Sequence, residues 1–356
     1  MGKIDLLGKT ILVTGSPGFI GANLVMRLLK ELTQGVVVSF DNMNDYYSPS
    51  LKEYRLQEIQ NVNEKCGAVR HVFLKGSIAD KDSVNRLFSE YNFDIVVNLA
   101  AQAGVRYSID HPDIYLDTNV IGFYNILEAC RRYSIKHLVY ASSSSVYGEN
   151  NKIPFSEQDK ADCPVSLYAA TKKCDELLAY SYSKLYDIPS TGLRFFTVYG
   201  PAGRPDMFYF SATNKLVSGQ KIQIFNHGNM QRDFTYIDDI VEGIYRVMQG
   251  PPEKKYDDNG HIIVPPHAVF NIGGGQPENL MQFVHILQEE LVRAGVLSQD
   301  YDFEGHIELV GMQPGDVPLT YADASALEKD YGFVPKVGIR EGLRNFSTWY
   351  ARYYGY

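Results

Sequence analysis

The chain has 356 residues, of which 45% are hydrophobic and 21% are charged. This length and composition are those of a folded protein with one large or two ordinary domains, and they exclude a short disulfide-stapled peptide and a disordered chain. With 42 acidic against 34 basic side chains, the formal net charge is −8. Such a field disfavours nucleic acid and anionic membrane surfaces as partners.

The first half of the chain alternates short β-branched runs with helix-like segments. The predicted strands cover 11–13, 36–38, 69–74, 95–97 and 137–140, and the first predicted helix covers 18–32. Apolar strands separated by amphipathic helices pair in parallel through right-handed crossovers. The pattern therefore predicts an α/β fold with a doubly wound parallel sheet.

The alternation ends after Arg194, where prolines, glycines and aromatic residues interrupt it. We expect a first domain at 1–195, completed by returning sheet segments at about 234–272. A smaller, mixed α/β substrate-binding domain should comprise 196–233 and 273–356. The proline-rich segment 251–266 is expected to form a surface loop.

The segment 112–132, between the fourth and fifth predicted strands, carries apolar residues around most of a helical circumference. A helix that is apolar on nearly all sides is buried. It is buried either in the core of its own subunit or against a partner subunit.

The four cysteines, Cys66, Cys130, Cys163 and Cys174, show no CxxC spacing and no clustering with histidine. This usage is typical of reduced structural thiols, so we expect a cytoplasmic protein without a metal site. The chain shows no signal peptide and no stretch of about 18 apolar residues, so we expect neither export nor a membrane span.

Gly15, Gly18 and Gly21 directly follow the first predicted strand and open the first predicted helix. At such a junction, glycines let backbone amides approach a pyrophosphate at the positive end of the helix. Asp41 ends the second predicted strand, 20 residues after Gly21, which is the spacing of a carboxylate that accepts ribose hydroxyls. No Arg or Lys lies between Asp41 and Leu51, so the pattern predicts NAD rather than NADP.

Tyr168 and Lys172 are four residues apart in a predicted helix, 166–186, and so share one face of it. The serine run 142–145 follows the fifth predicted strand, at the ligand-binding edge of the sheet. An unperturbed phenol titrates near pH 10, so it acts as a base at neutral pH only beside a cation such as a lysine ammonium. The three features together predict an acid–base site.

Seven motifs spread along the chain carry a family resemblance. They are GSPGFIG, NLAAQAGVRYS, ASSSSVYG, YAATK, LRFFTVYGPAGRPDM, RDFTYIDD and QPGDVPLTYAD. The chain resembles the extended short-chain dehydrogenase/reductases, which have a Rossmann fold, and within them the UDP-glucuronate 4-epimerases. The resemblance extends from about residue 9 to residue 350.

The resemblance implies roles for the residues of the acid–base site. Tyr168 would be the base, Lys172 its activator and a ligand of the nicotinamide ribose, and Ser143 the hydroxyl partner. Ser144 and Ser145 would face the sugar. NAD would be the cofactor, held on residues 1–195.

Nucleotide and sugar contacts are implied in the same way. Arg232 would bind the phosphates, Ile222 to Phe225 would cradle the uracil, and Arg204 would place charge near the diphosphate or the carboxylate. Thr197 stands where many sugar-nucleotide epimerases have Asn, which is the variant typical of uronate epimerases. The further substrate contacts are Arg106 and Asp316, and the further cofactor contacts are Phe19, Ile20, Asn42, Ser77, Ile78, Leu99, Ala100 and Ala101.

Three positions leave alternatives open. Ser77 stands where the family usually has an Asp that contacts adenine, so it would offer a weaker, uncharged hydrogen bond. Arg106 pairs with Asp110 or contacts the substrate. Arg194 is expected to be structural.

The resemblance implies C4 epimerisation of a UDP-hexuronate through a transient 4-keto sugar. Dehydratases and decarboxylases of this superfamily carry carboxylates where this chain has Ser144 and Ser145. A UDP-glucose or UDP-N-acetylhexosamine 4-epimerase remains an alternative, whereas a non-catalytic dinucleotide sensor would be expected to lack Tyr168 or Lys172. A homodimer is also implied, with helices 112–132 and 166–186 side by side at a two-fold axis.

Overall fold

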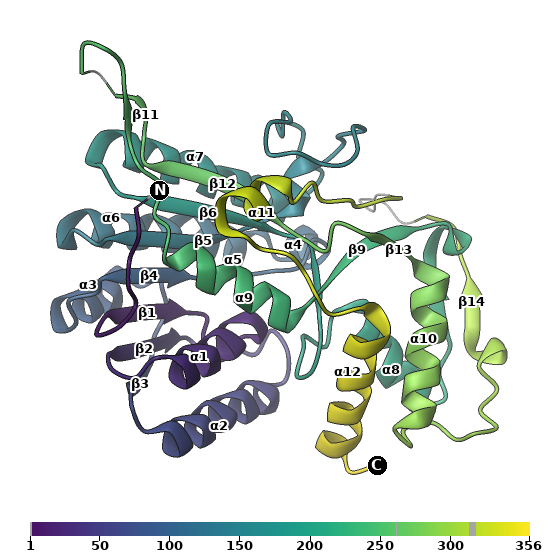
Figure 1. The fold of residues 1–356 in the computed structure, drawn as a ribbon. Helices are drawn as coiled ribbons and strands as arrows, with labels where there is room; N and C mark the ends of the chain where they lie inside the picture. Colours follow the sequence, from purple (N-terminus) through teal and green to yellow (C-terminus); the bar gives the residue numbers. More distant parts are fainter. Residues whose placement is uncertain (1, 261, 313–317) are drawn as a thin grey trace.

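The computed structural model describes residues 2–260, 262–312 and 318–356. Its main feature is a seven-stranded sheet in the order β12-β6-β5-β4-β1-β2-β3, in which every neighbouring pair is parallel (Figure 1). The strands are β1 (Thr10–Thr14), β2 (Val36–Asp41), β3 (Arg70–Lys75), β4 (Ile95–Asn98), β5 (His137–Ser143), β6 (Ser190–Phe195) and β12 (His267–Ile272). The predicted doubly wound, Rossmann-type sheet is confirmed.

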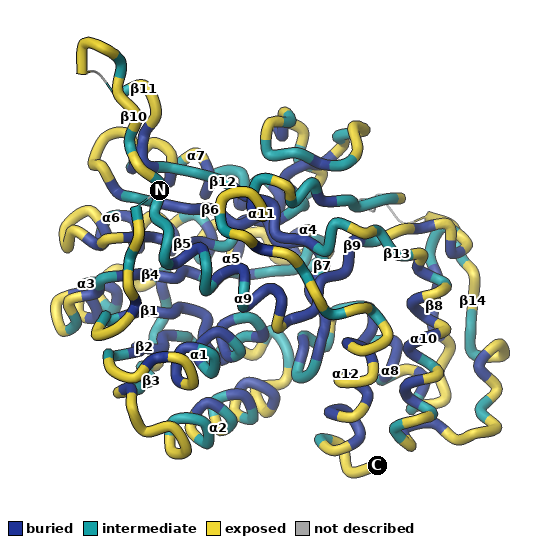
Figure 2. Tube along the Cα trace, in the orientation of Figure 1, coloured by how far each residue is buried: buried dark blue, intermediate teal, exposed yellow. Residues whose placement is uncertain are grey.

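Helices cover both faces of this sheet because each central strand is apolar on both sides. Along β1, Ile11 and Val13 belong to one apolar cluster, and Leu12 belongs to the cluster on the opposite face. One layer contains α1 (Phe19–Glu31), α2 (Pro49–Cys66) and α9 (Ile237–Met248); the other contains α3 (Lys81–Glu90), α6 (Phe123–Tyr133) and α7 (Leu167–Tyr186). Figure 2 shows the central strands of the sheet mostly buried and many residues of the outer helices exposed, whereas the edge strand β3 is only partly buried.

The predicted helix 112–132 is three consecutive segments. These are α5 (Pro112–Tyr115), a π-helical segment η1 (Leu116–Gly122) and α6, and the short α4 (Tyr107–Asp110) precedes them. π-Helical turns often occur at functional sites. In η1 the turn places Asn119 in the interior, where its amide nitrogen donates to Thr171 Oγ1 on α7 (3.0 Å).

The C-terminal half forms smaller sheets beside the main one. One contains β7 (Thr197–Tyr199), β9 (Gln231–Tyr236) and β13 (Pro277–Asn279), and another contains β8 (Ile222–Ile224) and β14 (Ile307–Leu309). The helices α8 (Phe208–Val217), α10 (Leu280–Arg293) and α12 (Ile339–Tyr354) pack around them, α11 (Ser325–Tyr331) lies against β12, and η2 (Ser144–Tyr147), η3 (Phe225–Gly228) and η4 (Glu304–His306) are short 3-10 turns.

Two expectations for this half were wrong. The segment expected to return to the main sheet at about 234 is β9, which pairs with β7 and β13 instead, so only α9 and β12 rejoin the first half. The expected loop 251–266 contains a two-stranded hairpin, β10 (Lys255–Tyr256) and β11 (Ile262–Val264), which extends away from the body (Figure 1). Short strands at loop tips have no apolar alternation long enough to detect.

All four cysteines are free thiols. Among the described residues, no helix has the length and apolarity that crossing a membrane requires.

Candidate active site

A cavity of about 1070 Å³ lies at the carboxyl ends of β1 to β6, where ligands bind in parallel α/β sheets. Its other wall comes from β8, η3 and β9. All predicted site residues of the described chain line this cavity: Gly15, Gly18, Phe19, Ile20, Gly21, Asp41, Asn42, Ser77, Ile78, Leu99, Ala100, Ala101, Arg106, Ser143, Ser144, Ser145, Tyr168, Lys172, Thr197, Arg204, Ile222, Phe225 and Arg232. Asp316 lies outside the described residues. What each residue binds stays a prediction.

The glycine loop after β1 has the shape that a dinucleotide needs. Gly15 has a φ of +69°, and a Cβ there would lie 2.7 Å from the Ala100 nitrogen. A Cβ on Gly21 would collide with the Gly15 carbonyl. Ser16 Oγ is buried and has no hydrogen-bond partner among the described residues. A close backbone turn at a helix start, with an unused hydroxyl, fits the pyrophosphate of NAD.

At the end of β2, Asp41 faces a cation that the sequence analysis missed. Lys52 Nζ lies 3.8 Å from Asp41 Oδ1 and donates to Asn44 Oδ1 (2.6 Å). Asp41 also accepts the Met43 N–H (2.7 Å). Burial raises the pKa of Asp41 although Lys52 and the Met43 amide lower it, and burial lowers the pKa of Lys52. Lys52 stands one residue beyond the Asp41–Leu51 stretch that contains no basic residue.

Ser77 makes a contact within its own turn, and its expected contact with adenine stays a prediction. Ser77 lines the cavity, and its Oγ accepts the Ala79 N–H (3.2 Å), which leaves no carboxylate at this position.

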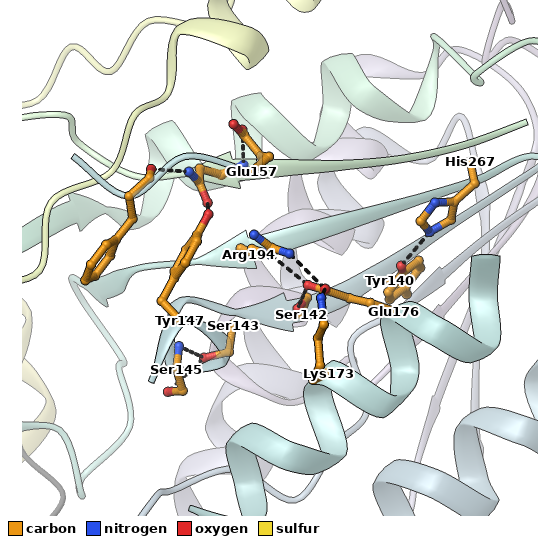
Figure 3. A network of polar contacts seen from close by, with 12 residues as sticks. Tyr140, Ser142, Ser143, Ser145, Tyr147, Glu157, Lys173, Glu176, Arg194 and His267 are labelled. Carbon is orange, nitrogen blue, oxygen red and sulfur yellow. Dashed lines mark hydrogen bonds and ion pairs between the residues drawn. The ribbon is translucent and has the colours of Figure 1, made fainter. Parts of the chain in front are cut away.

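The serine run turns sharply at the end of β5. Ser143 Oγ accepts the Ser145 N–H (3.2 Å) and donates to Ser145 Oγ (3.2 Å). The neighbouring Ser142 points to the other side of the strand, where its hydroxyl donates to Glu176 on α7 (2.7 Å; Figure 3). The alternation of a strand thus directs Ser143 to the cavity and Ser142 to the sheet–helix interface.

Tyr168 and Lys172 lie on the first turns of α7, on the face toward the cavity, as expected for that spacing. Ser166 caps this helix, since its hydroxyl accepts the Ala169 N–H (3.1 Å). Lys172 is buried and donates to the Ala141 carbonyl (3.0 Å) and to Asp175 Oδ2 (3.1 Å). The Tyr168 ring meets Tyr115 edge-on, with centroids 6.1 Å apart.

A buried ion pair holds α7 against the sheet. Arg194 Nε and Nη2 donate to the two carboxylate oxygens of Glu176 (2.8 and 2.9 Å), and Lys173 Nζ lies 3.1 Å from Glu176 Oε2 (Figure 3). Burial raises the pKa of Glu176, but the hydrogen bonds and charge of Arg194 outweigh it and leave the pKa below its ordinary value. The structural role expected for Arg194 is confirmed.

On the side of the cavity built by the C-terminal half, the predicted site residue Arg204 and its neighbour across the cavity, Arg106, each have a partner. Arg204 pairs with Asp206, which also accepts the Tyr46 hydroxyl (3.2 Å). Arg106 stacks over Phe225, with 5.4 Å from its guanidinium carbon to the ring centroid. Both alternatives for Arg106 thus omitted its aromatic neighbour.

Arg232 is held by backbone. Its Nη1 donates to the carbonyls of Gln231 (3.0 Å) and Pro318 (3.2 Å). The guanidinium therefore reaches the cavity with its plane already restrained.

Sequence reasoning missed several cavity and supporting residues. They are Asn44, Tyr46, Lys52, Asn119, Asp175 and Asp206. A wider window after Asp41 would have found Lys52, and the i, i+3 spacing of Lys172 and Asp175 was visible as a helical ion pair. The other contacts join segments far apart in the sequence and leave no local signal.

Comparison with known proteins agrees with this geometry. The profile of the NAD dependent epimerase/dehydratase family matches residues 11–273. Protein CapI of Staphylococcus aureus is 47% identical over 97% of this chain and 99% of its own. A probable UDP-glucuronate 4-epimerase of Rhizobium meliloti is 42% identical over 96% of this chain and 97% of its own.

A solved structure shares the whole fold. The UDP-glucuronic acid 4-epimerase from Bacillus cereus, in complex with UDP-glucuronic acid and NAD, is 30% identical with a TM-score of 0.80. The match covers 97% of this chain and 100% of that one. The family profile and these relatives, together with the glycine turn and the Tyr168–Lys172 pair in one cavity, show that the chain belongs to the NAD dependent epimerase/dehydratase family.

Proposed function

We propose that this protein is an NAD-dependent epimerase that inverts C4 of UDP-glucuronate to give UDP-galacturonate. The observation that carries the proposal is that Tyr168, Lys172 and Ser143 share one cavity with the glycine cradle and with Ser144, Ser145 and Thr197. The similar Bacillus cereus enzyme is described as acting on this substrate. A sugar bound in this cavity, between the ends of the main-sheet strands and the wall formed by β8, η3 and β9, would contact an acid–base group and several hydroxyls.

The chain's own residues perform the proton chemistry. When bound, NAD supplies the capacity to accept a hydride from C4 and to return it to the opposite face. Tyr168 as phenolate takes the proton of the C4 hydroxyl, and the ammonium of Lys172 stabilises the negative oxygen. Ser143 hydrogen-bonds the same sugar oxygen. The resulting 4-keto sugar turns about its diphosphate linkage, and Tyr168 then returns the proton.

Substrate charge requires local cations, because the whole chain carries −8. Arg232 and Arg204 are the residues that we assign to the diphosphate. Their existing hydrogen bonds restrain both guanidinium groups before substrate binds. Ile222 and Phe225 line the adjoining part of the cavity and would contact the uracil.

The hydroxyls near the sugar have a protective role in this scheme. Oxidising C4 makes the C6 carboxylate β to a ketone, and such acids lose CO₂ when the C5–C6 bond aligns with the carbonyl π system. Ser144, Ser145 and Thr197 would hold the carboxylate out of that alignment by charge-assisted hydrogen bonds. A carboxylate side chain in their place would repel it.

We also propose that the molecule is a cytoplasmic homodimer. The adjacent helices η1/α6 and α7 expose large apolar side chains: Ile121 and Tyr124 on the first, Leu177 and Tyr180 on the second. Leu177 is 59% exposed. A second copy would bury this face, and the two exposed free cysteines, Cys66 and Cys163, fit a reducing compartment.

We also propose a binding role for each part of the chain. We assign NAD binding to 1–195 with the returning elements within 234–272, and UDP-sugar binding to 196–233 and 273–356.

Replacing Tyr168 with Phe should abolish turnover while preserving the ring. We expect interconversion of UDP-glucuronate and UDP-galacturonate, followed by chromatography without added NAD, to fall at least about a hundredfold. NAD should remain bound. Tyr186→Phe, at an exposed position at the end of the same helix, is the matched control and should keep parental turnover. Activity of Tyr168→Phe near that of the parent would refute the assignment, and turnover of UDP-glucose in preference to UDP-glucuronate would favour the alternative substrate.

Asp41→Ala should shift cofactor preference toward NADP. The variant loses the acceptor for the ribose hydroxyls and frees the Lys52 ammonium, 3.8 Å away, to meet a 2′-phosphate. We expect the NADP-to-NAD affinity ratio, measured by calorimetry on nucleotide-free protein, to rise about tenfold or more. The double variant Asp41→Ala, Lys52→Met should lose that gain. If it keeps the gain, Lys52 does not face the phosphate.

Thr197→Ala and Ser145→Ala should each raise the fraction of turnovers that release CO₂. The expected product is a UDP-pentose or its 4-keto form, detected by mass spectrometry. Ser211→Ala is the control, because this hydroxyl also borders the cavity but donates to the Phe208 carbonyl (3.1 Å). Should neither variant release more CO₂ per turnover than the parent, these hydroxyls do not guard the carboxylate.

Light scattering at micromolar concentration should report a dimer for the parent. Leu177→Glu should shift the mass to that of a monomer, because it places a charge in the apolar contact. Leu309→Glu, at a site 51% exposed on β14, should leave the dimer intact. A monomeric parent would remove the proposed interface.

A further inference from the structure

A buried carboxylate on α7 has no part in the chemistry described so far. Asp175 is 2% exposed and lies one helical turn after Lys172. Its Oδ2 accepts from Lys172 Nζ at 3.1 Å, and its Oδ1 has no hydrogen-bond partner among the described residues. A carboxylate that is buried but only half satisfied costs folding free energy.

Ionising the Asp175 carboxyl in this buried position is costly. Burial raises the pKa of Asp175 to about 7, against the lowering effect of Lys172 and with a smaller rise from Glu176. Because this pKa lies above its unfolded value, folding stability falls as pH rises from about 4 through 7 and stays lower above it. An amide of the same shape would fill the site without that cost. The group that the carboxylate contacts is Lys172.

Most other ionisable groups near Asp175 in the described chain are engaged elsewhere. The exception is Cys174 on α7, a half-buried thiol whose pKa is raised by burial and by the charge of Asp175. Glu176 on α7 is paired with Arg194 of β6 and Lys173. Tyr140 of β5, whose pKa burial raises well above 10, hydrogen-bonds His267 of β12 (3.0 Å). The further ionisable side chains on elements packed against α7 are Tyr107 and Asp110 of α4, Asp113 and Tyr115 of α5, Asp117 of η1, Tyr124, Glu128, Cys130, Arg131, Arg132 and Tyr133 of α6, His137 of β5 and Tyr147 of η2. Burial raises the pKa of the Cys130 thiol and lowers that of His137, which bonds Thr191 Oγ1. The others are at least partly exposed or bonded to other groups.

Hydrogen-bond geometry shows what Asp175 does to Lys172. An ammonium has three N–H donors. One goes to the Ala141 carbonyl at the end of β5 and one to Asp175, which leaves a single donor for the cavity that Lys172 lines. Without Asp175, the ammonium could rotate and present two donors. The carboxylate therefore fixes the direction of the remaining N–H.

Electrostatics adds a second effect. Tyr168 and Asp175 are seven residues apart on one helix, which is two turns or about 10 Å along the axis. At that distance, a negative charge opposes part of the positive field that Lys172 exerts on the tyrosine oxygen.

We propose that Asp175 is a positioning residue of the active site, which orients the Lys172 ammonium and moderates the positive charge that Lys172 presents to Tyr168. This inference rests on the proposed function in assigning the base role to Tyr168. It concerns how Asp175 and Lys172 together set the charge near Tyr168, which the proposed function alone does not specify.

Asp175→Asn tests the charge with little change of shape. In the NAD-loaded enzyme, we expect the acidic midpoint of the kcat-against-pH profile to move to lower pH by about half a unit or more. The reason is that Lys172 then acts on Tyr168 without an opposing charge. Asp175→Glu, which keeps the carboxylate, should have the parental midpoint. Asp162→Asn, which removes an equally signed but exposed carboxylate, should leave the profile unchanged.

A second measurement does not depend on turnover. The ultraviolet absorbance of tyrosinate, titrated in the parent and in Asp175→Asn, each compared with its Tyr168→Phe counterpart, isolates the ionisation of Tyr168. The same downward shift is expected there. If Asp175→Asn does not fold, Asp175→Ser replaces it, because the smaller side chain removes the charge and leaves no buried carboxylate.

The outcomes separate this inference from the proposed function. A midpoint that stays in place or moves upward in both the profile and the titration overturns the role of Asp175, even if the parent epimerises UDP-glucuronate. A parent that does not epimerise UDP-glucuronate overturns the proposed function, and the titration still decides the role of Asp175.

Discussion

The position of α7, which carries Tyr168 and Lys172, depends on one buried ion pair, between Glu176 of α7 and Arg194 of β6. Desolvating two charges is costly, and here two parallel hydrogen bonds and a third from Ser142 offset that cost. Tyr168 and Lys172 lie on the same helix as Glu176. The pair therefore fixes their height above the sheet, and Ser142 connects the same carboxylate to the strand that carries Ser143 (Figure 3).

The parts of the site that could be predicted from sequence each follow a strand end. Gly15 after β1, Asp41 at the end of β2 and Ser143 at the end of β5 are separated by long stretches of chain. In a parallel sheet, the carboxyl ends converge on one edge, so recognising the strands was enough to bring these residues together. The spacing of Tyr168 and Lys172 likewise needed only the helical repeat. Fold class and the cofactor side thus follow from local patterns.

The rest depends on contacts between distant segments. Tyr46 reaches Asp206 across 160 residues, and Asn119 reaches Thr171 across 52. No local pattern encodes such pairs. The strand β9 was expected to return to the main sheet, but its partners are β7 and β13. Asp175 is a related case. A Lys–Asp pair at i, i+3 usually lies on a helix surface, where it contributes little free energy, and the sequence does not show that this pair is buried.

A common arrangement unites the charged residues of the cavity. Three cations that line it, Lys52, Lys172 and Arg204, each lie beside a carboxylate. Asp41 and Asp206 also line the cavity, whereas Asp175 lies behind Lys172. Pairing lowers the net positive field available to a polyanionic substrate, but it fixes each cation before binding. A protein of charge −8 therefore relies on a few oriented donors rather than on bulk attraction. Oriented donors distinguish one sugar oxygen from another, which a diffuse positive field could not do.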